Sequence, residues 1–177
     1  MGDERRREAA VLVPVYRDGD GELRMVFVRR SAGGRHGGQL AFPGGNREPG
    51  DADLTATALR EAEEEIGLSP DAVEVLAELP AVETRTTGYR VTPVLGRLVG
   101  PHQQWRLQQA EIAGVVDVAV DDLAAPQARS EQLLSFPTWP EPRLTPVVTV
   151  GDDLLWGVTL RIAEPVLPRL LAGEWKV

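Results

Sequence analysis

The chain has no cysteine among its 177 residues. That absence excludes disulfides, thiolate nucleophiles and zinc–thiolate sites. Long apolar runs are missing too: no stretch approaches the roughly 18 apolar residues that a membrane span requires. The N-terminal sequence MGDERRREAA lacks the apolar segment of a signal peptide. We therefore expect a soluble, cytoplasmic protein without a membrane partner.

Positive charge is in deficit, because 19 lysines and arginines face 27 aspartates and glutamates, for a net charge of −8. This balance argues against binding to nucleic acid or to an anionic membrane surface. A small phosphorylated substrate stays compatible, since local arginines and a metal can outweigh the overall sign. The length fits one domain over residues 1–177, in which residues 1–8 form a loose lead-in.

Acidic side chains gather on one expected helix, which begins near Asp53 and ends at Gly67. Apolar residues recur along it at helical spacing, at Leu54, Ala58, Ala62 and Ile66. On an adjoining arc lie three carboxylates, those of Glu61, Glu64 and Glu65, while Glu63 points away. Such neighbours repel each other, and Arg60 is the basic residue among them. The helix is therefore expected to bind a cation, and all-oxygen ligands favour Mg²⁺, Mn²⁺ or Ca²⁺ over zinc. The alternative is a solvated acidic face.

Two glycine-containing turns precede this helix. Phe42-Pro43-Gly44-Gly45 follows a short apolar strand, and Pro49-Gly50-Asp51 forms a second turn. A strand, a glycine-rich loop and a carboxylate helix in succession let backbone groups approach a phosphate or a metal closely. Upstream, residues 30–45 combine glycines with Arg30, Arg35 and His36, which suits either a phosphate cradle or a mobile connector.

The rest of the chain reads mainly as strands. They are expected at residues 9–16, 24–29, 40–42, 73–79, 90–99, 115–120 and 145–150. Pro93 and Gly96 predict an edge or irregular strand at 90–99. Residues 130–146, rich in proline and aromatic residues, are expected to cover one end of the fold, and residues 154–171 are expected to form a helix that Pro165 and Pro168 kink or shorten.

These residues resemble a known family, the Nudix hydrolases. The pattern of their metal-binding box is matched by Gly45, five residues, Asp51, and then Arg60-Glu61-x-x-Glu64-Glu65-x-Gly67-Leu68. Two features depart from the general box: Asp51 stands in place of a glutamate, and one extra residue separates it from Arg60. Both are also found in the subfamily that resembles coenzyme A pyrophosphatases.

A second motif of that subfamily lies just upstream of the box. It is matched by Arg30-Ser31, Arg35 and Gly38-Gln39-x-x-Phe42-Pro43-Gly44-Gly45, with the gap between Arg35 and Gly38 one residue shorter than usual. Residues 87–93 and the segment Trp156-Gly157-x-Thr159 are also similar to the subfamily. The resemblance covers about residues 11–171.

The resemblance implies an α/β/α sandwich around a central mixed sheet, with residues 60–68 on one face and 156–171 on the other. It further implies Mg²⁺ or Mn²⁺ held by these glutamates, with Arg60 orienting them through a salt bridge. The i, i+4 spacing favours Glu61 and Glu65 as the main ligands, joined by the Gly45 carbonyl.

Several roles stay open at this point. Glu64 is either a third ligand or the general base, and Asp51 supports the loop or a second metal. Glu111 is an additional ligand, a base or a solvent-facing side chain. Substrate-binding cations are expected at Arg30, Arg35 and Arg85, although a loop arginine such as Arg85 or Arg90 is commonly just solvated.

The implied reaction is hydrolysis of coenzyme A or its thioesters to a phosphopantetheine-type product and adenosine 3′,5′-bisphosphate. One alternative is a Nudix pyrophosphatase for another nucleoside diphosphate derivative, such as ADP-ribose, NADH or a dinucleoside polyphosphate. A non-catalytic nucleotide sensor is the second alternative. Nudix proteins often form dimers, so a homodimer is compatible with the resemblance.

Overall fold

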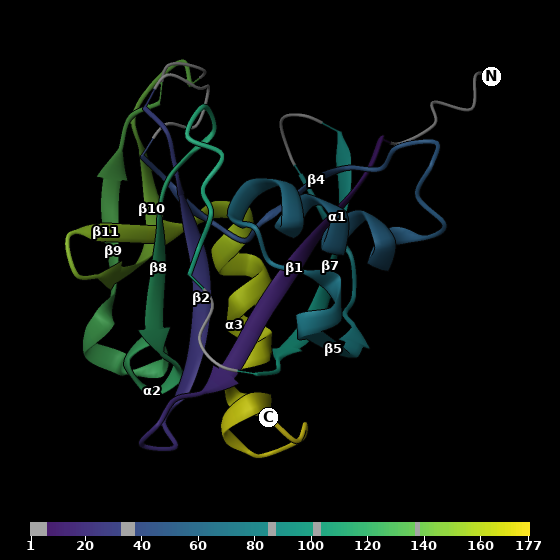
Figure 1. Cartoon of the computed structure of the whole chain (residues 1–177). Coiled ribbons are helices and arrows are strands. Elements are labelled where there is room, and N and C mark those ends of the chain that lie inside the picture. Colours follow the sequence, from purple (N-terminus) through teal and green to yellow (C-terminus); the bar gives the residue numbers. More distant parts are fainter. Residues whose placement is uncertain (1–6, 33–37, 85–87, 101–103, 137–138) are drawn as a thin grey trace.

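A computed structural model describes residues 7–32, 38–84, 88–100, 104–136 and 139–177. Within these ranges the main element is a mixed sheet in the order β3-β2-β1-β7-β5, with β4 paired to β1, β6 to β7 and β8 to β2 (Figure 1). Strands β1 and β7 pair in parallel. The strands are β1 Arg7–Arg17, β2 Leu23–Arg30, β3 Leu40–Ala41, β4 Gly44–Asn46, β5 Val73–Glu78, β6 Val82–Glu83, β7 Tyr89–Leu98 and β8 Ile112–Ala119.

Helices cover both faces of this sheet, and a second, three-stranded antiparallel sheet lies beside it (Figure 1). The helices are α1 Leu54–Ile66, η1 Pro70–Ala72, α2 Val120–Ala124, η2 Pro126–Ala128 and α3 Gly157–Leu171. The second sheet has the order β11-β10-β9, with β9 Arg129–Leu134, β10 Arg143–Val150 and β11 Asp153–Trp156. Among the residues that the structure describes, no helix is both long enough and apolar enough to cross a membrane.

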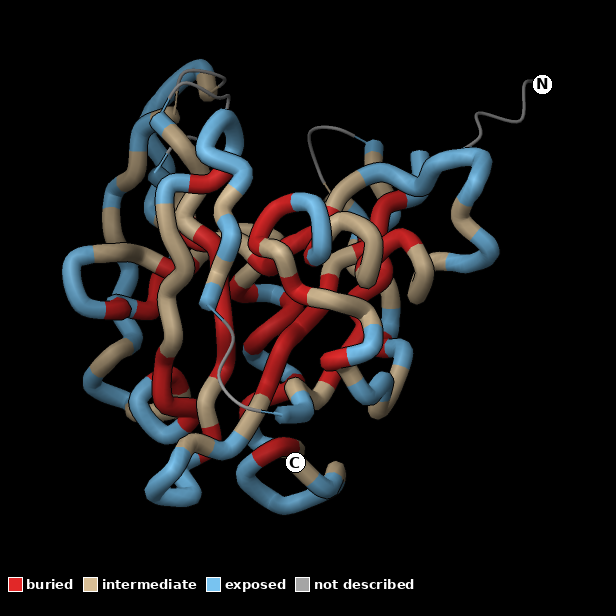
Figure 2. The backbone as a smooth tube through the Cα atoms, in the orientation of Figure 1, coloured by how far each residue is buried: buried red, intermediate tan, exposed pale blue. Residues whose placement is uncertain are grey.

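Strand β1 divides the hydrophobic core into two halves, because side chains alternate across a strand. Ala10 and Leu12 pack with the buried face of α1, whereas Val13 and Val15 pack with α3 and the second sheet. All four are fully buried, and Figure 2 shows the buried stretch running through the centre of the molecule. The expected α/β/α arrangement, with one helix on each face of a mixed sheet, is confirmed.

Helix α1 has the ends that its sequence predicts. The Asp53 carboxylate accepts a hydrogen bond from the Ala56 amide (2.7 Å), which satisfies one of the free donors in the first turn. Gly67 ends the helix in the left-handed region (φ 70°), with its amide bonded to the Glu63 carbonyl. A Cβ at position 67 would lie 2.9 Å from the Arg106 Cβ, so glycine is required by packing as well as by conformation.

Strand β7 corrects one prediction. It lies in the centre of the sheet between β1 and β5, not at an edge. The Pro93 carbonyl accepts from the Leu79 amide (2.8 Å), near a register shift in the partner strand β5. Gly96 is needed for contact: a Cβ there would lie 2.6 Å from Val73 and 2.9 Å from Leu12. Pro93 and Gly96 predicted an edge or an irregular strand: the edge is wrong, whereas the ladder with β5 is irregular as the second alternative stated.

The C-terminal third also differs from expectation. Residues 130–146, predicted only to cover one end of the fold, supply most of β9 and the start of β10, and the two strands pair in a regular antiparallel ladder. The last helix begins at Gly157 rather than at residue 154, since residues 153–156 pair with β10 as strand β11. Pro165 and Pro168 lie inside α3 and do not end it before Leu171.

We predict that Gly44→Ala destabilises the protein by about 1–3 kcal/mol, the usual range for overpacking. A Cβ at this position would lie 2.3 Å from the Ala10 carbonyl oxygen and 2.6 Å from the Val11 Cα, so backbone would have to move. Gly50→Ala is the matched control, because its Cβ would meet nothing within 4 Å. Urea unfolding of both variants measures the difference, and equal stabilities would contradict the packing argument.

Candidate active site

The glycine turn and helix α1 meet at a buried carboxylate. The Gly44 amide donates a hydrogen bond to Oε2 of Glu65 (3.1 Å), whose residue is only 2% exposed. Pairing of β4 with β1 fixes the turn in this position, with Gly44 opposite Val11. The Glu61 carboxylate lies directly against Gly45, where a Cβ would come within 2.5 Å of Oε1. A missing side chain at residue 45 therefore makes room for a carboxylate beside the backbone.

Arg60 forms hydrogen bonds with three of the acidic side chains. Its guanidinium donates two hydrogen bonds to Asp51 (2.9 and 3.1 Å), one to Glu61 (3.1 Å) and one to Glu64 (3.2 Å). A further bond to the Asn46 carbonyl (3.0 Å) fastens the same group to the glycine turn. The planar fork of arginine suits such multiple contacts. The expected salt bridge between Arg60 and the glutamates is present in the structure.

Both carboxylate oxygens of Asp51 accept hydrogen bonds from neighbouring groups. Besides Arg60, the Glu48 amide and the Thr57 hydroxyl each donate to Oδ2 (2.9 Å). The bond with Arg60, helped by these donors, holds the pKa of Asp51 well below its usual range. Asp51 thus ties the second turn to the start of α1.

Burial dominates the electrostatics of the two inner glutamates. It raises the pKa of Glu65 from 4.5 to about 7, an effect that Arg30 and the Gly44 amide oppose and that the charges of Glu61 and Glu111 strengthen. Burial also raises the pKa of Glu61, against the attraction of Arg60 and with the help of Glu64 and Glu111. Glu61, Glu65 and Glu111 are therefore close enough to repel one another.

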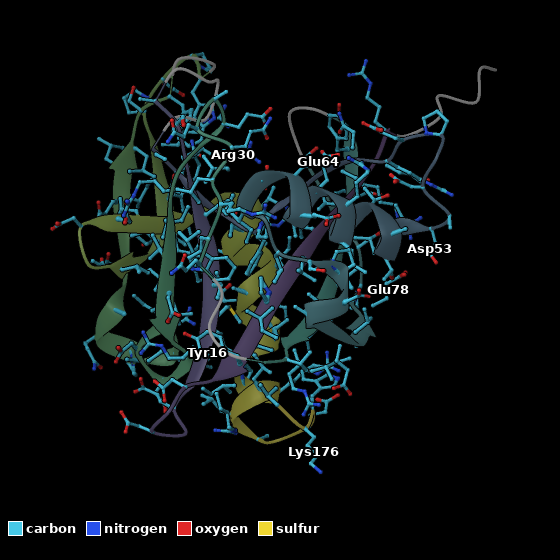
Figure 3. All side chains as sticks on the ribbon, in the orientation of Figure 1. Tyr16, Arg30, Asp53, Glu64, Glu78 and Lys176 are labelled. Carbon is cyan, nitrogen blue, oxygen red and sulfur yellow. The ribbon has the colours of Figure 1, made fainter. Side chains whose placement is uncertain are left out.

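Two further expected residues come to the same end of the molecule. Arg30 ends β2 and lies within electrostatic reach of Glu65, and Figure 3 shows it at the same end as Glu64. Glu64 itself is exposed, with 54% of its side chain accessible. Glu111 precedes β8 and is also exposed. Arg35 and Arg85 lie outside the described residues.

Sequence reasoning missed the segment that positions Glu111. The Arg106 amide bonds to the Ile66 carbonyl and the Gln108 amide to the Glu65 carbonyl, both at 3.0 Å, along the end of α1. From the end of β2, the Ser31 amide donates to the Glu111 carbonyl and the Ser31 hydroxyl to the Gln109 carbonyl. Most of these bonds use backbone groups, which any residue carries, so no side-chain pattern could have indicated them.

The donor chemistry of the site fits a hard divalent cation. Glu61 and Glu65 offer oxygen atoms beside the Gly44–Gly45 backbone, and burial, with a smaller contribution from neighbouring carboxylates, raises the pKa of both. Among the described residues, however, no three acidic or histidine side chains stand together in a group that could hold a metal.

Comparison with solved structures identifies the fold. A Nudix hydrolase from M. smegmatis, RenU, superposes with a TM-score of 0.66 at 17% identity, covering 97% of this chain and 89% of that one. The NUDIX domain of Shewanella oneidensis NrtR complexed with ADP ribose gives 0.59 at 20% identity, covering 94% and 90%. These likenesses establish a Nudix-type α/β/α fold.

The sequence identifies the family directly. Residues 6–137 match the family model for the NUDIX domain, so the chain belongs to the Nudix family, whose hydrolases generally use divalent metal ions. A relative from Citrobacter koseri, "Uncharacterized Nudix hydrolase NudL", is 43% identical over 118 residues, which cover 66% of this chain and 59% of the relative. A protein of the same name from Salmonella paratyphi B is 43% identical over 117 residues, covering 64% and 57%. The matched region thus spans less than two thirds of either relative.

We predict that the metal-free protein loses stability between pH 4.5 and 7 because of Glu65. A folded-state pKa of about 7 lies above the unfolded value, so the folded state favours the protonated carboxyl, and this preference is lost as the pH rises through 7. At about 1.4 kcal/mol per pKa unit, the full effect is on the order of 3 kcal/mol. Urea unfolding in a chelating buffer measures it. Glu65→Gln should flatten this part of the profile, and an unchanged slope would contradict the assignment.

Proposed function

We propose that this chain is a metal-dependent Nudix pyrophosphohydrolase that cleaves the pyrophosphate linkage of coenzyme A or its thioesters. The observation that carries the hydrolase assignment is the carboxylate array around Arg60, packed against the Gly44–Gly45 turn. It combines oxygen donors, backbone access and excess negative charge in one place. These are the properties that a cation-assisted attack on a phosphorus anhydride requires.

In this proposal Glu61 and Glu65 hold the cation, Mg²⁺ or Mn²⁺, together with the Gly45 carbonyl. The bound ion would supply neutralisation of the pyrophosphate oxygens and an acidified water. Arg60 orients Glu61 and Glu64 through its hydrogen bonds. Asp51 supports the loop, because its oxygens are already occupied by Arg60, Glu48 and Thr57.

Two carboxylates are available to accept the proton from the attacking water. Glu64 is exposed and bonded to Arg60, which suits either a third metal ligand or the base. Glu111 is exposed, directly before β8, and its charge raises the pKa of both inner glutamates. The two variants Glu64→Gln and Glu111→Gln separate these roles, because loss of the base lowers kcat while metal affinity is retained.

The coenzyme A assignment rests on the motif match that begins at Arg30-Ser31 and on the features of the box around Asp51. Arg30, Arg35 and Arg85 are the proposed contacts for substrate phosphates. Because the matched region spans less than two thirds of its relatives, the activity of the whole protein is likewise a proposal. We further propose that residues 1–177 form one domain, that the protein is cytoplasmic and that it forms a homodimer.

Another nucleoside diphosphate derivative is the second candidate substrate. It is favoured by the fold shared with the NUDIX domain that is complexed with ADP ribose. A C. elegans Ap4A hydrolase, with a TM-score of 0.54 at 22% identity, covering 66% of this chain and 82% of that one, extends the range to dinucleoside polyphosphates. A nucleotide sensor that binds without cleaving is the remaining alternative.

A substrate panel tests the proposal. Coenzyme A, dephospho-coenzyme A, ADP-ribose, NADH and diadenosine polyphosphates are incubated with Mg²⁺ or Mn²⁺, and the phosphate-containing products are identified. Preference for coenzyme A over its dephospho form is expected, together with release of adenosine 3′,5′-bisphosphate. Cleavage of another compound would retain the hydrolase and overturn the coenzyme A assignment. Metal binding without turnover of any compound would favour the sensor.

We predict that Glu61→Gln lowers kcat/KM by at least about 100-fold, because the substitution removes a charged oxygen donor beside Gly45. Glu63→Gln is the matched control: it makes the same change on the same helix, at an exposed residue for which no contact with the array is seen. Binding of Mn²⁺, measured by calorimetry, should weaken in Glu61→Gln and stay unchanged in Glu63→Gln. Equal activity of the two variants would remove Glu61 from the proposed metal site.

A further inference from the structure

The chain that leads into Glu111 folds into a tight turn. Its hydrogen bonds converge on the Gln108 carbonyl, which accepts from the Glu111 and Ile112 amides at 2.9 Å each. Strand β8 starts at Ile112, which is 1% exposed. The backbone of Glu111 therefore lies between a closed turn on one side and the buried first residue of a strand on the other.

Two different elements fasten this turn. On the side of helix α1, the Gln108 amide bonds to the Glu65 carbonyl at 3.0 Å. That carbonyl belongs to the last turn of the helix, where no intrahelical partner is available to it. On the side of β2, the Ser31 amide donates to the Glu111 carbonyl (2.8 Å), and the Ser31 hydroxyl donates to the Gln109 carbonyl (3.1 Å).

Ser31 sits where the regular pairing of the sheet ends. The ladder between β2 and β8 shifts register between Arg29 and Arg30, and its last pair joins Arg30 to Ile112. Beyond that point, the two bonds from Ser31 take the place of further strand pairing. The same residue follows Arg30 directly, so one short stretch of chain places both a cation and the Glu111 turn at the site.

These hydrogen bonds affect the position of Glu111 only if the turn would move without them. The Glu111 charge opposes those of Glu61 and Glu65, and an exposed carboxylate on a short turn can lower this repulsion by moving outward. Bonds to the backbone on both sides of the turn resist that movement. Neither of them engages the Glu111 carboxylate itself, which stays available for chemistry.

We propose that Ser31 is a positioning residue that holds the 108–111 turn, and with it the Glu111 carboxylate, facing Glu61 and Glu65. The inference rests on the proposed hydrolase function in so far as Glu111 takes part in turnover. It adds a role for a residue to which the proposed function assigns neither a phosphate contact nor a metal bond. The bond from its hydroxyl is the part that substitution can remove, since the amide bond persists in any variant except proline.

Two variants at this position, with one elsewhere, test the proposal. Ser31→Ala should lower kcat by about threefold to tenfold, the range for losing one neutral hydrogen bond, while KM changes by less than about twofold. Ser31→Thr keeps a hydroxyl and should restore kcat. Thr145→Ala is the matched control, because it removes a hydroxyl that bonds to the Arg143 carbonyl (3.0 Å) on the second sheet. A loss of the same size in Thr145→Ala would overturn the proposal.

A double-substitution cycle asks whether Ser31 acts through Glu111. If it does, Ser31→Ala lowers kcat in the wild-type background but has no further effect in Glu111→Gln. An equal loss in both backgrounds would show a general structural role and overturn the proposal. So would wild-type activity of Glu111→Gln.

Hydrogen exchange gives a readout that does not depend on turnover. In the metal-free protein, the amides of residues 108–112 should exchange about threefold to tenfold faster in Ser31→Ala than in the wild type, and Ser31→Thr should reverse the change. Unchanged exchange would overturn the proposal. If the wild type cleaves none of the compounds in the panel, the proposed function fails, and the exchange comparison alone decides whether Ser31 holds the turn.

Discussion

The ion-pair array at Arg60 is the interaction on which the acidic site depends. One guanidinium, with 21% of its side chain exposed, faces Asp51, Glu61 and Glu64 and reaches the Asn46 carbonyl as well. Without it, carboxylates on the same helical arc would repel each other and the glycine turn would lose its link to α1. Lysine could not replace this pattern, because a single ammonium cannot reach so many acceptors in one plane.

Strand β1 connects this array to the rest of the protein. Its Ala10 and Leu12 lie under α1, its pairing with β4 holds Gly44 and Gly45, and its parallel ladder with β7 runs through the centre of the sheet. The alternate side chains Val13 and Val15 belong to the core beneath α3. A disturbance at the glycine turn is therefore passed directly to both halves of the core. Close packing, which leaves no room for a Cβ at residue 44, makes that coupling stiff.

The parts of the fold that follow from local chemistry were predictable. Helix α1 was placed to within a residue at both ends, because Asp53 and Gly67 are direct cap signals and its apolar spacing is regular. Of the two alternatives predicted for β7, the edge was wrong and the irregularity is present as a register shift in its ladder with β5, while Gly96 is explained by its close contacts with Leu12 and Val73. Strand β9 escaped prediction because its polar residues show no alternation, and the turn before Glu111 escaped because its bonds are made mainly by the backbone.

The charge balance of the site has a consequence for how a substrate could bind. The protein is acidic overall, and a pyrophosphate is anionic, so approach is unfavourable until positive charge is added. Arg60 cannot supply it, because its guanidinium is already engaged by Asp51, Glu61 and Glu64. In the described part of the chain, Arg30 is the cation that acts on Glu65 and is not drawn into that array. A bound divalent ion would therefore carry most of the attraction for phosphate. Thermodynamic linkage then requires that substrate and metal each raise the affinity for the other by the same factor.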